Sequence, residues 1–145
     1  LFAWATRNGA RVAGASPADQ ERLSGFGERL GIAFQLVDDV LDYSGEQTGK
    51  SLLADLKEGK LTLPLVLAVA RRPELAQALK RIHAGDREPV QLVSQAVIET
   101  GACDEVRRRA GLYTQTAVEA LSSLMPGPAR VLLENVASEL ARRAA

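Results

Sequence analysis

Three aspartates lie in the most hydrophobic helical segment of the chain, in the stretch FQLVDDVLDYSGEQTGK at residues 34–50. A carboxylate in apolar surroundings costs several kcal/mol unless it is paired, hydrogen-bonded or bound to a metal. At about 100° per residue, the polar side chains of this segment fall within one quadrant of a helix: Gln35, Asp38, Asp39 and Asp42. Apolar residues cover most of the remaining arc, so we expect a helix in the middle of a bundle, with its polar stripe facing a cavity or cleft.

The three aspartates predict a site for a divalent cation. Carboxylates on one stripe repel each other, and without a counter-ion at least one of them should take up a proton. Mg²⁺ prefers oxygen ligands and is usually held by one or two carboxylates together with substrate phosphates. The carboxylates also lie near the end of the predicted helix, where the helix dipole favours a cation. The alternative is a solvated acidic face without a ligand.

Two lysines beside glycines follow the aspartates, in TGK at residues 48–50 and in EGK at residues 58–60. A lysine on flexible backbone can fold over a phosphate group. Carboxylates, Mg²⁺, Lys50 and Lys60 together predict that a diphosphate binds as its Mg²⁺ complex. The chemistry served would be loss of a diphosphate leaving group, with the metal and the lysines stabilising its developing charge. The alternative is that both are ordinary surface lysines.

The rest of the chain predicts an all-α fold, because helical periodicity dominates and strict alternation is almost absent. Ser16, Pro17 and Asp19 form a typical helix start, and the segment from Ser44 to Gly59 is expected to be a loop with at most a short helical turn. His83 falls at a predicted helix end, where a cation is a sufficient explanation for it. Trp4 and Phe2 are expected in core or interface packing. The expected helices cover residues 1–14, 17–43, 63–71, 74–83, 88–100, 103–124 and 127–143.

Length and composition limit the possible classes of protein. The 145 residues suffice for one domain with a core, and 18 basic residues balance 18 acidic ones, so the net charge gives no argument for nucleic acid binding. A single cysteine excludes an internal disulfide, and no apolar run approaches the ~20 residues of a membrane span. We expect a cytoplasmic protein. The uncapped, helix-like start suggests that these residues are the later part of a longer protein.

The runs GIAFQLVDDVLDY, TGK and ADLKEGKLTLPLVLA together resemble the C-terminal half of trans-isoprenyl diphosphate synthases, the polyprenyl synthetases. The resemblance implies a partial helical bundle of the isoprenoid synthase type, with residues 1–145 forming the C-terminal half of one domain. It implies ionisation of an allylic diphosphate, attack by isopentenyl diphosphate and loss of a proton to give a trans double bond. It also implies Mg²⁺ as cofactor and a homodimer, and the isolated 145-residue chain is expected to be inactive.

Residue by residue, the resemblance assigns Asp38, Asp39 and Asp42 to the family's second aspartate-rich motif, with Asp38 as the most direct metal ligand. It assigns substrate contacts to four positions: Phe34, Gln35, Lys50 and Lys60. Catalytic roles fall on Asp38, Lys50 and Lys60. The first aspartate-rich motif and the basic residues that hold isopentenyl diphosphate belong upstream of this chain. Leu53 departs from the family, which often carries a small residue there. Two alternatives remain, a class I terpene cyclase and a non-catalytic partner subunit of a prenyltransferase.

Overall fold

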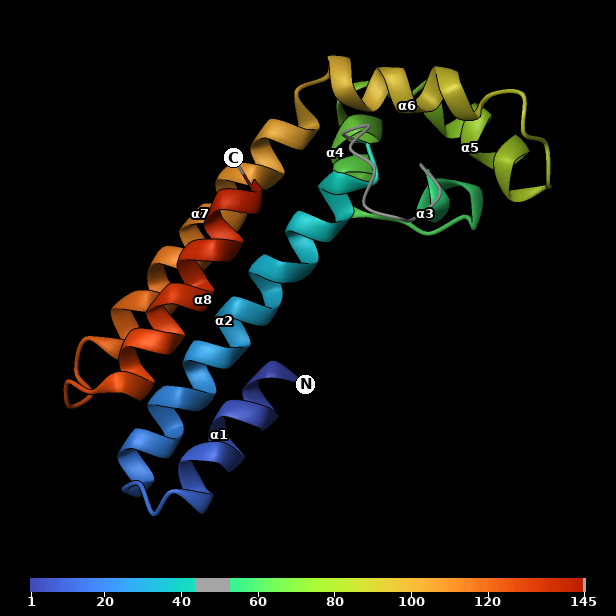
Figure 1. Cartoon of the computed structure of the whole chain (residues 1–145). Coiled ribbons are helices and arrows are strands. Elements are labelled where there is room, and N and C mark those ends of the chain that lie inside the picture. Colours follow the sequence, from blue (N-terminus) through green and yellow to red (C-terminus); the bar gives the residue numbers. More distant parts are fainter. Residues whose placement is uncertain (44–52, 145) are drawn as a thin grey trace. The chain divides into compact units, whose positions relative to one another are not determined.

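The computed structural model describes residues 1–43 and 53–144, and within these ranges every regular element is a helix (Figure 1). This confirms the predicted all-α fold. The elements are α1 (Phe2–Val12), α2 (Pro17–Leu41), α3 (Ala54–Lys57), α4 (Leu63–Arg71), α5 (Leu75–His83), α6 (Val90–Glu99), α7 (Ala102–Leu121) and α8 (Pro128–Ala144).

Helix boundaries follow the signals in the sequence closely. At the start of α2, the Ser16 Oγ accepts a hydrogen bond from the Asp19 backbone N–H at 3.2 Å and donates one to the Asp19 carboxylate at 2.8 Å. This arrangement satisfies one of the free N–H groups at a helix start. It also lowers the pKa of Asp19, chiefly through the Ser16 hydrogen bond and then through Arg22. The largest difference from the expected boundaries is at α7, which ends at Leu121 and not at residue 124.

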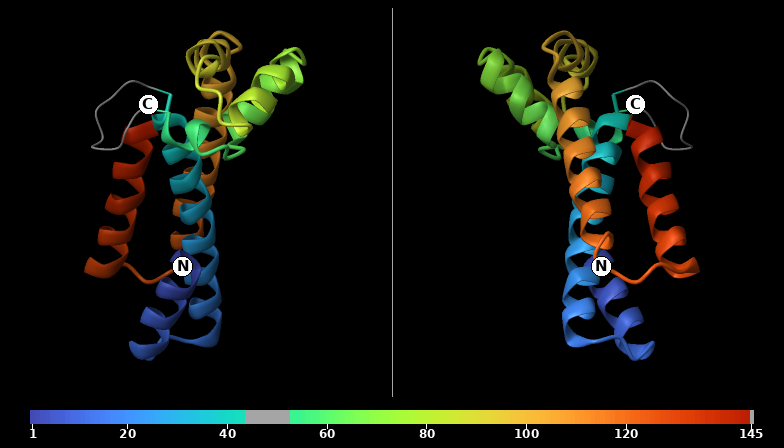
Figure 2. Two further views of the ribbon diagram at one scale, coloured as in Figure 1. Left: turned by 90° about the vertical axis from the view of Figure 1, so that its right-hand side faces the viewer. Right: turned by 90° about the vertical axis from the view of Figure 1, so that its left-hand side faces the viewer.

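The chain divides into two compact units, and the divisions fall within α2 and α7. The first unit comprises residues 1–37 and 108–145, and therefore contains α1, most of α2, most of α7 and α8. Within it α1 turns back along α2 (Figures 1 and 2). The Thr6 hydroxyl donates to the Leu23 carbonyl at 2.6 Å, and a Cβ at Gly27 would lie 2.6 Å from the Phe2 carbonyl oxygen. Glycine at position 27 therefore permits this close approach of the two helices.

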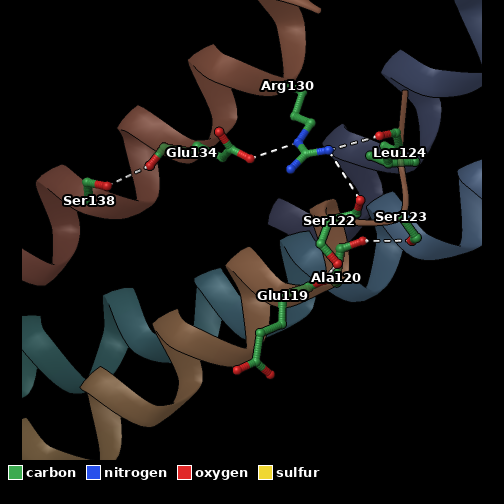
Figure 3. Close-up of polar contacts among 8 residues, drawn as sticks. All are labelled: Glu119, Ala120, Ser122, Ser123, Leu124, Arg130, Glu134 and Ser138. Carbon is green, nitrogen blue, oxygen red and sulfur yellow. Dashed lines mark hydrogen bonds and ion pairs between the residues drawn. The ribbon is translucent and has the colours of Figure 1, made fainter. Parts of the chain in front are cut away.

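Arg130 fixes the turn between α7 and α8 (Figure 3). Its Nη1 donates to the carbonyls of Ser122 at 3.2 Å and Leu124 at 3.0 Å, and its Nε donates to Glu134 at 2.8 Å. The last carbonyls of a helix have no partner within the helix, so a guanidinium from the next helix can satisfy carbonyls in the turn. The turn is therefore closed by side-chain contacts that lie within a few residues of one another.

The second unit comprises residues 38–107 and contains α3 to α6 with the adjoining ends of α2 and α7. Its core includes Leu56, Leu65, Val93 and Val97, each at most 1% exposed. The sequence of α4 is apolar nearly all round, so we expect this helix to be buried in the bundle. That expectation is only partly right, because Leu65 is buried whereas Val66 on the same helix is 48% exposed.

Trp4 is 68% exposed, so it does not pack in the core of this unit, and interface packing stays a prediction for it. Phe2 is half-buried, and its ring centroid lies 5.4 Å from that of Phe34. The helices that the structure describes include none with the length and hydropathy needed to cross a membrane.

Candidate functional site

The predicted metal-binding residues lie at the end of α2 and in the turn that follows it, all within the second unit. Asp39 is 9% exposed, and Asp38 and Asp42 are half-buried. Every buried side-chain nitrogen and oxygen of the described residues has a hydrogen-bond partner. The apolar helix therefore accommodates its carboxylates through polar contacts, as the cost of burying an unpaired charge requires.

Asp42 connects the aspartate motif to the short helix α3. Its Oδ1 accepts a hydrogen bond from the Ala54 N–H at 3.0 Å, and its Oδ2 accepts one from the Asp55 N–H at 3.2 Å. Leu53, the residue before α3, has a φ of +59° and forms no side-chain cap, so Asp42 supplies the cap from twelve residues upstream. Burial raises the pKa of Asp42, an effect that these hydrogen bonds oppose.

Tyr43 makes a second connection from the end of α2. Its side chain is buried, and its hydroxyl lies 3.4 Å from the hydroxyl of Thr62, the residue before α4. Burial raises the pKa of Tyr43 to about 12, against the opposing effect of the Thr62 hydrogen bond, so the phenol stays neutral at physiological pH. Asp42 and Tyr43 thus attach the aspartate motif to the start and to the end of the segment that contains EGKLT.

Lys60 lies at the end of this segment and is held by carboxylates. Its Nζ lies 2.8 Å from Asp55 Oδ1 and 2.8 Å from Glu58 Oε2. The hydrogen bonds to Asp55 and then to Glu58 raise the pKa of Lys60, so the side chain keeps its positive charge. Because Asp55 also donates its N–H to Asp42, one hydrogen-bonded path joins Asp42, Asp55 and Lys60.

The remaining predicted residues are not part of this path. Lys50 lies outside the described residues. Phe34 and Gln35 belong to the first unit, where both side chains are exposed and help to line a pocket between α1 and α2. Phe34 also lines a second pocket of about 290 Å³, whose walls are almost entirely apolar. Their predicted roles at a substrate stay predictions.

The donor set indicates which kind of metal site these residues suit. Within residues 1–43 and 53–144, no three carboxylate, histidine or cysteine side chains converge on a position for a metal ion. Mg²⁺ is commonly held by one or two carboxylates while phosphate oxygens and waters complete its octahedral shell. The half-buried Asp38 and buried Asp39 fit that arrangement, because hard oxygen donors at a helix C-terminus favour a cation.

Comparison with known proteins places the chain in a family. Residues 1–100 match the family described as Polyprenyl synthetase. The chain belongs to this family. It is 39% identical over 142 residues to octaprenyl diphosphate synthase of Escherichia coli, a match that covers 94% of this chain and 44% of that protein. It is 36% identical to the all-trans-nonaprenyl-diphosphate synthase of Rhodobacter capsulatus, covering 94% of this chain and 43% of that protein. The chain therefore spans less than half the length of these curated relatives.

Solved structures agree with this assignment. The fold superposes on a polyprenyl synthase from Caulobacter crescentus, complexed with calcium and isoprenyl diphosphate, with a TM-score of 0.88 and 37% identity. That match covers 99% of this chain and 46% of the other. A decaprenyl diphosphate synthase from Rhodobacter capsulatus gives a TM-score of 0.87 at 35% identity, covering 99% and 46% of the two chains. The family and the isoprenoid synthase fold that the motifs predict are both confirmed.

The sequence did not predict the long-range contacts of three residues in this region. The capping role of Asp42, the Tyr43 contact with Thr62 and the His83 contact with Gly59 all depend on partners at least twelve residues away. The tyrosine directly after the aspartate motif was visible in the sequence, but its buried partner was not. His83 ends α5 as predicted, and its ring also contacts the carbonyl of Gly59.

Proposed function

We propose that the protein containing this chain is a Mg²⁺-dependent trans-prenyltransferase, which condenses isopentenyl diphosphate with an allylic diphosphate. In this proposal residues 1–145 are the C-terminal half of its single domain and carry its second aspartate-rich motif. The observation that carries the proposal is the path of contacts from Asp42 through Asp55 to Lys60. This path connects the carboxylates at the end of α2 to the positively charged side chain of Lys60. Binding of a Mg²⁺–diphosphate complex needs carboxylates that bind the metal ion and a cationic side chain that binds the phosphate oxygens.

In this proposal, different residues of the second unit bind the metal ion, bind the diphosphate and hold the local structure in place. Asp38 and Asp39 would hold Mg²⁺, which when bound supplies positive charge to the diphosphate oxygens. Lys60, kept in its charged form, donates N–H groups to the leaving diphosphate as negative charge develops on it. Asp42 holds α3 in place, and the buried side chains of Val40 and Leu56 keep this part of the unit apolar. Exclusion of water from a carbocation would follow from such surroundings.

Relatives and neighbours support the ligand class. The named relatives are octaprenyl and nonaprenyl diphosphate synthases, and the Caulobacter structure contains calcium and isoprenyl diphosphate. By resemblance, Phe34, Gln35 and Lys50 would contact the allylic substrate, and the protein would be a cytoplasmic homodimer. Each of these assignments is part of the proposal.

A condensation assay tests the proposal. The protein containing this chain is incubated with radiolabelled isopentenyl diphosphate, Mg²⁺ and allylic diphosphates of different lengths, and extracted prenyl products are counted. We expect chain extension that is lost on chelation of Mg²⁺ and reduced at least about a hundredfold by Asp38→Ala. Arg130→Lys, in the first unit, is the matched control and should retain activity. No incorporation with any allylic diphosphate, or full activity in Asp38→Ala, would contradict the proposal.

A further inference from the structure

The imidazole ring of His83 lies between two backbone carbonyls of the second unit. Its Nε2 is 2.9 Å from the Gly59 oxygen, and its Nδ1 is 2.9 Å from the Leu79 oxygen, one turn earlier in α5. A carbonyl oxygen only accepts hydrogen bonds, so each contact requires an N–H at that nitrogen. A neutral imidazole has one N–H, whereas the imidazolium has two. Both contacts are therefore satisfied together only by the protonated ring.

Gly59 is adapted to this close approach. Its φ is +75°, and a Cβ there would lie 2.9 Å from His83 Cδ2 and 3.0 Å from Nε2. A side chain at position 59 would thus be strained by the backbone and would collide with the ring. A second cationic side chain donates to a nearby carbonyl: the Arg87 guanidinium donates to the Lys57 carbonyl. Two carbonyls at the end of α3 are therefore held by two cationic side chains from α5 and the turn after it.

The turn that His83 holds carries Lys60. Gly59 directly precedes Lys60, whose backbone N–H donates to the Asp55 carbonyl at 2.8 Å while its Nζ pairs with Asp55 and Glu58. The charged side chains of the two segments that meet here are Asp55, Lys57, Glu58 and Lys60 from α3 and its turn, and Lys80, Arg81, Asp86, Arg87 and Glu88 from α5 and its turn. Arg81 pairs with Asp86 and Glu88, so these carboxylates have a cation of their own.

We propose that His83, as an imidazolium that donates both N–H groups, is a positioning residue for Lys60. It fixes the backbone of the Glu58–Lys60 turn against α5 and thereby sets where the ammonium group is presented. The bridge that His83 makes between the two carbonyls involves only residues of this chain and does not depend on a ligand. Its consequence for a bound diphosphate rests on the proposed function, in which Lys60 contacts that ligand.

Nuclear magnetic resonance tests the bridge directly. The chain contains one histidine, and signals that disappear in His83→Gln identify its ring. We expect ¹⁵N signals of a ring that carries an N–H at both nitrogens, and amide signals of Gly59 and Lys60 that change when the ring loses one of these protons. A ring with a single N–H, or amides that do not respond to its loss of a proton, would overturn the bridge. Neither result depends on diphosphate binding.

Two variants test the positioning role, because each keeps one donor. The amide of Gln can replace Nε2 and reach Gly59, whereas the shorter Asn can replace only Nδ1. By calorimetry of inorganic diphosphate binding with Mg²⁺, we expect His83→Asn to weaken affinity about tenfold and His83→Gln less than about threefold. Equal losses in the two variants, or unchanged affinity in both, would refute positioning. Absence of binding by the wild type would instead refute the role of Lys60 in the proposed function, and with it this consequence of the bridge.

Discussion

Two connections between helices, α2 to α3 and α7 to α8, are both fixed by a charged side chain that satisfies backbone groups. At α7–α8, Arg130 donates to the carbonyls of Ser122 and Leu124, eight and six residues away, and Glu134 one turn later neutralises its charge. At α2–α3, Asp42 accepts N–H groups from Ala54 and Asp55, twelve and thirteen residues away. The first connection is local and its charge is balanced. The second closes a long segment with a half-buried carboxylate whose pKa is raised by burial.

The two connections differ in whether the residue that fixes the backbone also belongs to the predicted ligand-binding motif. Arg130 belongs to no ligand motif, so its contacts serve only the turn. Asp42 belongs to the aspartate motif and also caps α3, so a change there should affect both stability and ligand binding. A cap made by a motif residue links the position of Lys60 to the position of the aspartates, because Asp55 contacts both Asp42 and Lys60.

The largest effect on stability is expected at Leu53, within the long connection. Its side chain is 5% exposed although its φ of +59° is unfavourable for any residue except glycine. Leu53→Ala should lower the free energy of unfolding by about 3 kcal/mol through the lost apolar contacts. Leu53→Gly loses the same contacts but relieves the backbone, so it should be more stable than the alanine variant by about 1 kcal/mol. Urea unfolding measures both; a glycine variant less stable than the alanine variant would refute strain at this position.

Asp42→Ala should give the next largest loss of stability. Unlike a change at Arg130, it should also weaken ligand binding, which distinguishes the α2–α3 connection from the α7–α8 connection. Loss of two hydrogen bonds to a carboxylate leaves the start of α3 uncapped, which should cost about 2 kcal/mol of unfolding free energy. Binding of Mg²⁺ and inorganic diphosphate should weaken as well. Asp42→Asn keeps one acceptor oxygen and should lose about half as much stability. If Asp42→Ala were as stable as the wild type, the cap would contribute nothing.

Arg130→Ala should cost about 1 kcal/mol of unfolding free energy, because three hydrogen bonds in a solvent-accessible turn are exchanged for hydrogen bonds to water. Arg130→Lys keeps the charge but not the planar fork, so it should recover only part of the loss. Diphosphate binding should be unchanged in both variants. Weakened binding in either of them would show that the α7–α8 connection is not purely structural.

The smallest effect concerns the pH dependence of stability. Because burial raises the folded-state pKa of Asp42 above 3.8, the unfolded chain ionises first as pH increases. The contribution of Asp42 to stability therefore decreases as pH rises from 3.8 to its folded-state pKa and is constant above that value. Asp42→Asn removes this decrease, so its stability relative to the wild type should rise over the same interval. A parallel pH dependence of the two proteins in chemical unfolding would contradict the raised pKa.

Helices and family were predictable because their signals are local. The Ser16 cap, the apolar period of α2 and the motif run from Phe34 to Pro64 can all be read within a few residues. The connections were not, because the sequence does not show that Asp42 meets Ala54 or that His83 meets Gly59, 24 residues away. For Trp4 the sequence predicted core or interface packing and could not choose between them, because an aromatic residue in an amphipathic helix indicates an apolar contact but not the segment that provides it.

We propose that the carboxylates at the end of α2 hold a Mg²⁺–diphosphate complex, and a calorimetric titration can measure this binding without enzyme turnover. Inorganic diphosphate is titrated with Mg²⁺ into the protein containing this chain, into Asp38→Ala and into the matched control Arg130→Ala. We expect saturable heats for the wild type and the control, their disappearance when Mg²⁺ is chelated, and at least about tenfold weaker binding in Asp38→Ala. The same affinity in Asp38→Ala as in the wild type would contradict this proposal.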